Sequence, residues 1–213
     1  LILTIPGYLL FRYVRSNTQH HINVREGYMG VTLAWIVMSL AGVLPYIISG
    51  TIPGFINSLF ETVSGFTTTG ASILTDVESM PKSILFWRSL THWIGGIGII
   101  LLVIIILPTL KVGGYNLFSL ESSMKEKILP KTKSIAFRVL LIYLALTVSE
   151  IVILTAGGMK LFDSICHSFG CIATGGFSTK NTGLSLYSPF IQYVVAVFMF
   201  LAATSYVVFY YMV

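Results

Sequence analysis

The chain has 213 residues, of which 55% are hydrophobic and only 10% are charged, whereas a soluble domain carries about 25% charged residues. Its mean hydropathy is +0.86. Because so few charges cannot cover a water-exposed surface, this composition excludes soluble enzymes, nucleic-acid binders and disordered chains. The net charge of +5 is instead interpreted as a topology signal, since basic residues gather in the loops that stay in the cytoplasm.

Long apolar stretches predict an all-α polytopic membrane protein, because a helix needs about 20 residues to cross the bilayer. The first apolar stretch, residues 1–11, is interpreted as the end of a preceding helix. Full spans are expected at residues 28–49, 83–110, 135–156 and 188–213. Both termini fall inside apolar runs, so we expect the sequence to be part of a longer protein.

Basic residues divide the chain. Nine of the thirteen Lys and Arg residues lie in or beside two connections, which are therefore predicted to be cytoplasmic: Arg12, Arg15, Arg25, Lys111, Lys125, Lys127, Lys131, Lys133 and Arg138. The predicted organisation is a helix end with a cytoplasmic loop, a first helix–pore–helix unit, a basic cytoplasmic loop and a second such unit, at residues 1–26, 27–110, 111–134 and 135–213.

Two further apolar segments, residues 54–66 and 159–171, are too short to span the membrane. Each is followed by a run of small and hydroxyl residues, TTTGAS after the first and ATGGFS after the second. Irregular backbone at membrane depth is tolerated only where protein or water satisfies its polar groups. We therefore expect two re-entrant half-helices, each followed by a strand that faces an aqueous pathway.

Shifting the sequence by 105 residues superposes the two units and places Thr69-Gly70 on Thr174-Gly175. Both units begin and end on the cytoplasmic side, and such parallel repeats are related by an axis along the membrane normal. Backbone carbonyls can replace the hydration shell of potassium, and glycine permits the dihedral angles that direct them. The repeat therefore predicts a pore for a cation.

Three motifs carry a resemblance: SGFTTTGASIL at residues 64–74, FWRSLTHWIGGIG at residues 86–98 and ATGGFST at residues 173–179. They resemble the TrkH branch of the Trk/Ktr/HKT superfamily of potassium transporters. The resemblance implies parallel helix–pore-loop–helix units, as in potassium channels, with four units around one pore. The third and fourth units are absent from this chain.

Carried over to this sequence, the resemblance implies filter strands at residues 67–70 and 172–175, with Gly70 and Gly175 at the filter-glycine positions. Plant relatives that prefer sodium have serine at the first of these, so Gly70 favours potassium. The implied filter residues are Thr67, Thr68, Thr69, Gly70, Ile172, Ala173, Thr174 and Gly175. Potassium would be held by the backbone carbonyls of Thr68, Thr69, Ala173 and Thr174.

The function implied is channel-like potassium uptake across a bacterial inner membrane, with potassium as the transported substrate and no cofactor in this chain. The implied partners are membrane lipid, a second full-length subunit and a cytosolic nucleotide-binding ring of the TrkA or KtrA type. One alternative is a sodium- or proton-coupled symporter. Others are an intramembrane enzyme, although no nucleophile or metal-ligand set is present, and a structural assembly subunit.

Arg88 and Glu150 are ionisable residues inside predicted spans, where such residues are functional candidates by default. Both are expected to belong to the scaffold around the filter. Their similar depth would allow them to pair with each other. Arg88 could instead meet Glu61, and Glu150 could face a water-filled crevice.

Overall fold

The computed structural model describes residues 24–101 and 128–204, and all regular structure in these ranges is helical. The all-α class is thus confirmed. The predicted helix end at residues 1–11 and residues 111–127 of the basic loop lie outside the described part. The helices, in chain order, are α2 (Val24–Gly42), α3 (Leu44–Ser49), α4 (Phe55–Phe66), α5 (Lys82–Leu101), α8 (Ile128–Ala156), α9 (Leu161–Ile172) and α10 (Pro189–Ala203).

The first predicted span is interrupted by a turn at Val43, which separates α2 from α3. Pro45 lies in the first turn of α3, where its missing N–H group breaks no helical hydrogen bond. Gly50 then ends α3 in the left-handed region, with a φ of 64°. Residues 28–49 and 136–156 are the two described stretches that are long and apolar enough to cross a membrane.

The long helix of the second unit, α8, begins at Ile128, before its expected start at residue 135. The last part of the predicted basic loop is therefore helical. At its other end the amide of Met159 donates to the carbonyl of Leu154, and that of Gly158 donates to Thr155. With Gly158 at a φ of 96°, this is a Schellman motif, which satisfies the last carbonyls of a helix.

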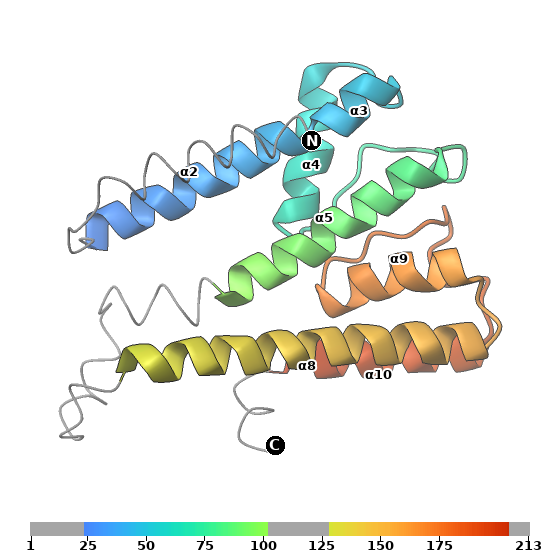
Figure 1. Ribbon diagram of the computed structural model, residues 1–213. Helices are drawn as coiled ribbons and strands as arrows, with labels where there is room; N and C mark the ends of the chain where they lie inside the picture. Colours follow the sequence, from blue (N-terminus) through green and yellow to red (C-terminus); the bar gives the residue numbers. More distant parts are fainter. Residues whose placement is uncertain (1–23, 102–127, 205–213) are drawn as a thin grey trace.

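The two half-helices, α4 and α9, pack on the two sides of α5, as Figure 1 shows. Helix α9 also packs against α8 and α10, while α4 packs against α2. Small residues allow this close approach: a Cβ at Gly95 of α5 would collide with the carbonyl oxygen of Phe66, and one at Gly96 would lie 3.0 Å from the Cβ of Ala173. Both half-helix ends are therefore held against α5.

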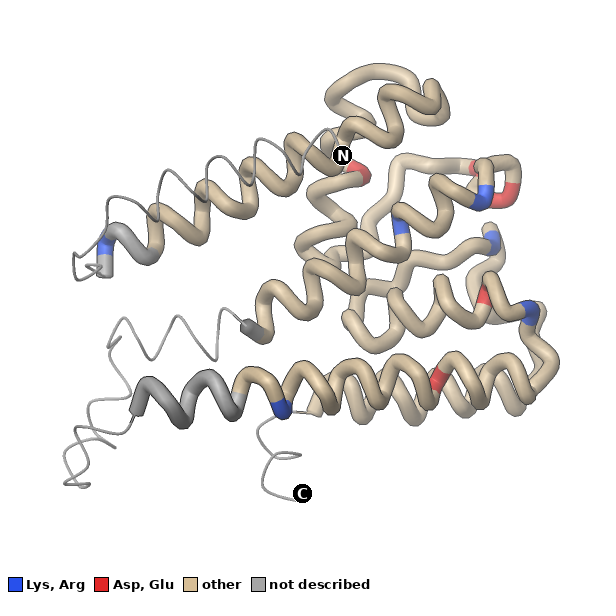
Figure 2. Tube along the Cα trace, in the orientation of Figure 1, with Lys and Arg blue, Asp and Glu red and all other residues tan. Residues whose placement is uncertain are grey.

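Charged residues are sparse along the helices, and many of those that are described lie at the end of the molecule that carries the loops after the half-helices (Figure 2). The apolar core of the second unit includes Tyr143, Leu154, Ile172, Val195 and Phe198. Large apolar side chains are also exposed on the outer faces of α2, α8 and α10, among them Val37, Val148 and Phe200. This distribution fits helices surrounded by lipid or by further membrane helices.

Candidate ion pathway

The two half-helices end in the same backbone motif. After α4, the amide of Thr68 donates to the carbonyl of Gly65 at 3.0 Å, and that of Thr69 donates to Ser64 at 3.0 Å. After α9, the amide of Thr174 donates to Cys171 at 2.8 Å. The amide of Gly175 likewise donates to Gly170 at 2.8 Å. This pair of bonds is again the Schellman arrangement.

The motif fixes the register between the two units, because it pairs Thr68 with Thr174. These two threonines have the same φ of 54°, and the glycines that follow two residues later, Gly70 and Gly176, have φ values of 76° and 88°. The expected superposition of Thr69-Gly70 on Thr174-Gly175 is therefore wrong by one residue. Gly176, rather than Gly175, is the structural counterpart of Gly70.

Threonine is an unusual residue for the left-handed region. The position that ends a Schellman motif is normally glycine, because a Cβ there is disfavoured, and a β-branched residue at positive φ is an outlier. Thr68 and Thr174 are the only non-glycine residues with positive φ in the described part of the chain. Such strain costs about 1–3 kcal/mol per residue and concentrates at functional sites.

The segments after the half-helices present backbone carbonyls with no protein donor. No other described residue donates a hydrogen bond to the carbonyls of residues 67–70 or 173–176. The side chains of Thr67, Thr69 and Thr174 are exposed, whereas Ile172, the last residue of α9, and Ala173 are buried. Uncompensated carbonyls are what a cation site built from backbone requires.

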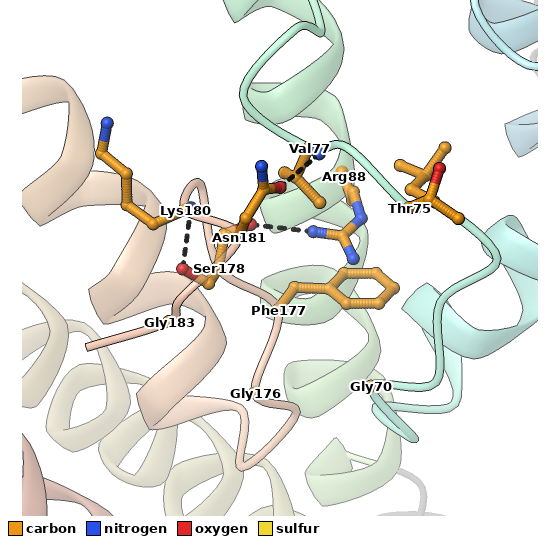
Figure 3. A pocket seen from close by; sticks show the side chains of 11 residues that line it. Gly70, Thr75, Val77, Arg88, Gly176, Phe177, Ser178, Lys180, Asn181 and Gly183 are labelled. Atoms are coloured by element: carbon orange, nitrogen blue, oxygen red, sulfur yellow. Dashed lines mark hydrogen bonds between the residues drawn. The ribbon is translucent and has the colours of Figure 1, made fainter. Parts of the chain in front are cut away.

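The two segments also meet. A Cβ at Gly70 would collide with the carbonyl oxygen of Gly175 and lie 3.9 Å from the Cα of Gly176. Only glycine leaves room for this approach. The two predicted filter strands are therefore brought together at Gly70 and Gly175, whereas the predicted filter residue Ile172 is the buried last residue of α9. Figure 3 shows Gly70 and Gly176 on these neighbouring segments.

Arg88 forms a buried ion pair with Glu61, with 2.6 Å between Nε and Oε1. The Glu61 carboxylate also accepts hydrogen bonds from the Ser72 hydroxyl at 2.9 Å and the Ile73 amide at 3.1 Å. A second nitrogen of the guanidinium donates to the carbonyl of Ser178 at 3.0 Å. Arg88 of α5 thus joins the first half-helix to the segments that follow both half-helices.

In the second unit, histidine replaces this acid. In the register that pairs Thr68 with Thr174, His167 is the counterpart of Glu61, and Ser178 is the counterpart of Ser72. The Nε2 atom of His167 is 3.0 Å from the hydroxyl of Ser178, and its Nδ1 is 2.8 Å from the carbonyl of Asp163. The contact between half-helix and serine is kept, but it needs no charged partner. Helix α10, which follows the second half-helix as α5 follows the first, contains no Lys, Arg or His that could take the place of Arg88.

Glu150 does not pair with Arg88. Its carboxylate is fully buried, has no hydrogen-bond partner among the described residues and lies beside the thiol of Cys171 in α9. The expected alternative of Arg88 with Glu61 is the one that the structure shows. Glu150 thus lies between α8 and the second half-helix, and its role in the scaffold around the filter remains a prediction.

The outer loops of the two units are tied together by Asn181. The side-chain oxygen of Asn181 accepts a hydrogen bond from the backbone amide of Val77 at 2.7 Å, and its side-chain nitrogen donates to the Asp76 carboxylate at 2.8 Å. The backbone amide of Asn181 donates to the Glu78 carboxylate at 3.2 Å. The Lys180 ammonium lies 3.6 Å from the Glu78 carboxylate. The contact of Asn181 with Val77 is drawn in Figure 3. We refer to this set of contacts as the outer clasp.

Comparison with known proteins decides the family. Residues 3–213 match the family model TrkH, described as a cation transport protein. The chain belongs to the TrkH family. The Trk system potassium uptake protein TrkH of Escherichia coli strain K12 is 41% identical over 187 residues, and its counterpart in Vibrio parahaemolyticus is 37% identical over 194 residues. The protein TrkG of Escherichia coli strain K12 is 32% identical over 203 residues.

The fold of this TrkH-family chain is also that of a solved relative. The crystal structure of the potassium transporter TrkH from Vibrio parahaemolyticus matches with a TM-score of 0.78 at 35% identity, over 90% of this chain and 38% of that one. The matches cover 85%, 88% and 93% of this chain, but only 39%, 40% and 42% of the three relatives. The family and the apolar helices identify an integral inner-membrane protein.

Proposed function

We propose that this TrkH-family chain supplies two of the walls of a potassium pathway, with the segments at residues 67–70 and 173–176 as filter backbone. The observation that carries the proposal is the repeated turn at Thr68 and Thr174, which the two units build with the same φ and the same hydrogen bonds. Strained backbone concentrates at functional sites, and here it occurs at matching positions of both units. A carbonyl ring around an ion explains it.

The electrostatics favour a cation. Each segment follows the carboxyl end of a half-helix, where the helix dipole places partial negative charge, and its carbonyls accept nothing from other described residues. Arg88, a cationic side chain that lines the same pocket as Gly70 and Gly176, has its charge neutralised by Glu61.

Potassium is the ion that we propose, because the printed names of the relatives are those of potassium uptake proteins. We further propose that transport is channel-like, that the complete protein works as a homodimer of pore subunits, and that a cytosolic nucleotide-binding ring of the TrkA or KtrA type regulates it. Potassium would move down its electrochemical gradient through the filter. No covalent step is needed.

The test is ion flux through the complete protein in liposomes. A channel is expected to carry potassium at a rate set by voltage and the potassium gradient, with no response to an imposed sodium or proton gradient. Potassium uptake that is driven by either of these gradients would instead establish the symporter alternative. Equal flux of potassium, sodium and chloride would contradict the proposed filter.

A matched pair of glycine variants locates the pathway. Gly70→Ala adds a Cβ that collides with the carbonyl of Gly175, whereas Gly30→Ala on α2 meets nothing within 4 Å. We expect Gly70→Ala to lose most potassium flux and Gly30→Ala to keep it. The same loss in both variants would show that flux does not report on the filter segments.

A further inference from the structure

His92 is a buried residue of α5 that neither the ion pair nor the Schellman motifs involve. Its side chain is fully buried, and neither ring nitrogen has a hydrogen-bond partner among the described residues. A histidine that makes no hydrogen bond is expensive to bury.

The ring lies flat against the second filter segment. A Cβ built on Gly175 would be only 2.7 Å from each of three ring atoms of His92, namely Cγ, Cδ2 and Cε1. The Cα of Gly175 therefore faces the ring. Gly175 has no positive φ, so its lack of a side chain is required by this contact and not by its backbone conformation.

The ring is itself held in place by Phe177. The two ring centroids are 3.9 Å apart, with 28° between the ring planes. The guanidinium carbon of Arg88 lies 3.5 Å from the centroid of the same Phe177 ring, and Figure 3 shows the guanidinium above that ring. Because Arg88 and His92 are four residues apart on α5, they lie on one face of the helix, and Phe177 packs between them.

Gly175 is also the residue that the first filter segment approaches. Its carbonyl oxygen is what a Cβ at Gly70 would strike. The backbone of Gly175 is thus confined between Gly70 on one segment and the His92 ring on the helix behind. The ring therefore lies directly behind the residue at which the two segments meet.

We propose that His92 is a positioning residue for ion selectivity: its flat ring, stacked on Phe177, sets where the Gly175 backbone lies in the filter. The inference rests on the proposed function, since it assigns a role within that filter. The ring acts through its shape, because its carbon atoms and its flat face make the contacts with Gly175 and Phe177. Selectivity depends on the spacing of carbonyls, so this residue controls preference between ions without touching one.

The test measures the potassium-to-sodium permeability ratio of the complete protein in liposomes. His92→Leu keeps the apolar volume but removes the flat face, and we expect the ratio to fall about tenfold, the change that about 1.4 kcal/mol in relative site energy produces. His92→Phe keeps a flat ring without nitrogens and should retain most of the wild-type ratio. Phe200→Leu, at an exposed site on α10, is the matched control.

A second pair of variants tests the contact even if His92→Leu fails to fold. Gly175→Ala should abolish flux, because its Cβ strikes the ring. The double variant Gly175→Ala with His92→Ala removes the obstacle and should recover expression and part of the potassium flux. A double variant no better than Gly175→Ala alone overturns the inference.

Two further outcomes are decisive. A wild-type permeability ratio in His92→Leu, or a ratio in His92→Phe as low as that of His92→Leu, would show that the flat ring does not position the filter. If wild-type protein itself shows no preference for potassium, the proposed function fails instead. The two failures are therefore distinguishable.

Discussion

Glu61 and His167 occupy equivalent positions in the two half-helices, and each makes a hydrogen bond to the serine that follows its own filter segment. In the first unit the acid is neutralised by Arg88, whose guanidinium also reaches the carbonyl of Ser178 in the second unit. In the second unit the contact is between uncharged groups. The units therefore share one backbone geometry and differ in the charge that holds it.

Glu61→Gln is expected to destabilise the protein severely. Glutamine keeps an oxygen for Ser72, but it leaves the buried Arg88 guanidinium without a counter-charge. Removing one partner of a buried pair costs about 3–5 kcal/mol. Thermal unfolding of the complete protein in detergent should show a large fall in Tm relative to wild type.

The double variant Glu61→Gln with Arg88→Gln supplies the control, because it removes both charges together. It should be more stable than Glu61→Gln alone, since no buried charge is left unpaired. The Tm changes of Glu61→Gln alone and Arg88→Gln alone should therefore not add up to that of the double variant. If they did, the ion pair would not be the source of the loss. Arg88→Lys keeps the charge, but its Tm should stay well below that of wild type. Lysine lacks the forked donors that reach both Glu61 and Ser178.

His167→Glu tests the same relationship from the second unit. It would place a buried acid in α9, while α10 offers no Lys, Arg or His to pair with it. We expect poor expression and a lowered Tm, because an unpaired buried charge is costly. His167→Gln can still pair with Ser178 and the carbonyl of Asp163, and it should express normally. Equal behaviour of the two variants would contradict this account.

Thr174→Gly should separate stability from selectivity. Glycine relieves the positive φ of 54°, which costs a β-branched residue about 1–3 kcal/mol, so Tm should stay level or rise. The flexible turn would hold the carbonyls less firmly, and the potassium-to-sodium ratio should fall. A variant with lower Tm and unchanged ratio would show that the threonine serves packing. Thr68→Gly is expected to change Tm and the potassium-to-sodium ratio in the same directions as Thr174→Gly.

The outer clasp predicts a pH dependence. The hydrogen bond from Asn181 is the main cause that lowers the pKa of Asp76 below its usual value. A carboxyl group whose folded pKa is lowered stabilises the protein above its unfolded pKa, and this contribution is lost as the pH falls through the folded pKa. Asn181→Ala should therefore lower Tm at neutral pH relative to wild type, with a smaller difference in acid, below the folded pKa of Asp76. A difference that is the same at all pH values would assign the effect to the lost side-chain contact with the Val77 amide.

The order and approximate bounds of the helices could be predicted, because the length and hydropathy of each apolar stretch decide whether it spans the membrane or forms a half-helix. Both half-helices were expected close to their observed bounds, since apolar runs of a dozen residues followed by Gly and Thr have few other uses in a membrane. The start of α8 was placed too late, because its first two turns contain Pro130, Lys131 and Lys133. Proline near a helix start is tolerated.

The alignment of the two units and the residue that packs against Arg88 and His92 were harder to predict from the sequence. The letters TG occur once in TTTGAS and once in ATGGFS, and matching them gives a shift that is one residue too short. Only the hydrogen bonds and φ values reveal that Thr68, and not Thr69, corresponds to Thr174. Helical spacing places Arg88 and His92 on one face, but it does not say that Phe177 of the second unit packs between them. Long-range contacts of this kind depend on how the units associate.

The corrected register leads to a last prediction, which compares Gly70→Ser with Gly176→Ser. Both glycines have positive φ, so serine is strained at either position, but their surroundings differ. A Cβ at Gly70 collides with the Gly175 carbonyl, whereas one at Gly176 meets nothing within 4 Å. Gly70→Ser should therefore reduce the potassium-to-sodium ratio and potassium flux far more than Gly176→Ser does. Gly30→Ser, on an open face of α2, should match wild type in both. Ion flux in liposomes at equal protein content measures the three variants. A larger loss in Gly176→Ser than in Gly70→Ser would mean that the meeting of Gly70 with Gly175 does not shape the pathway.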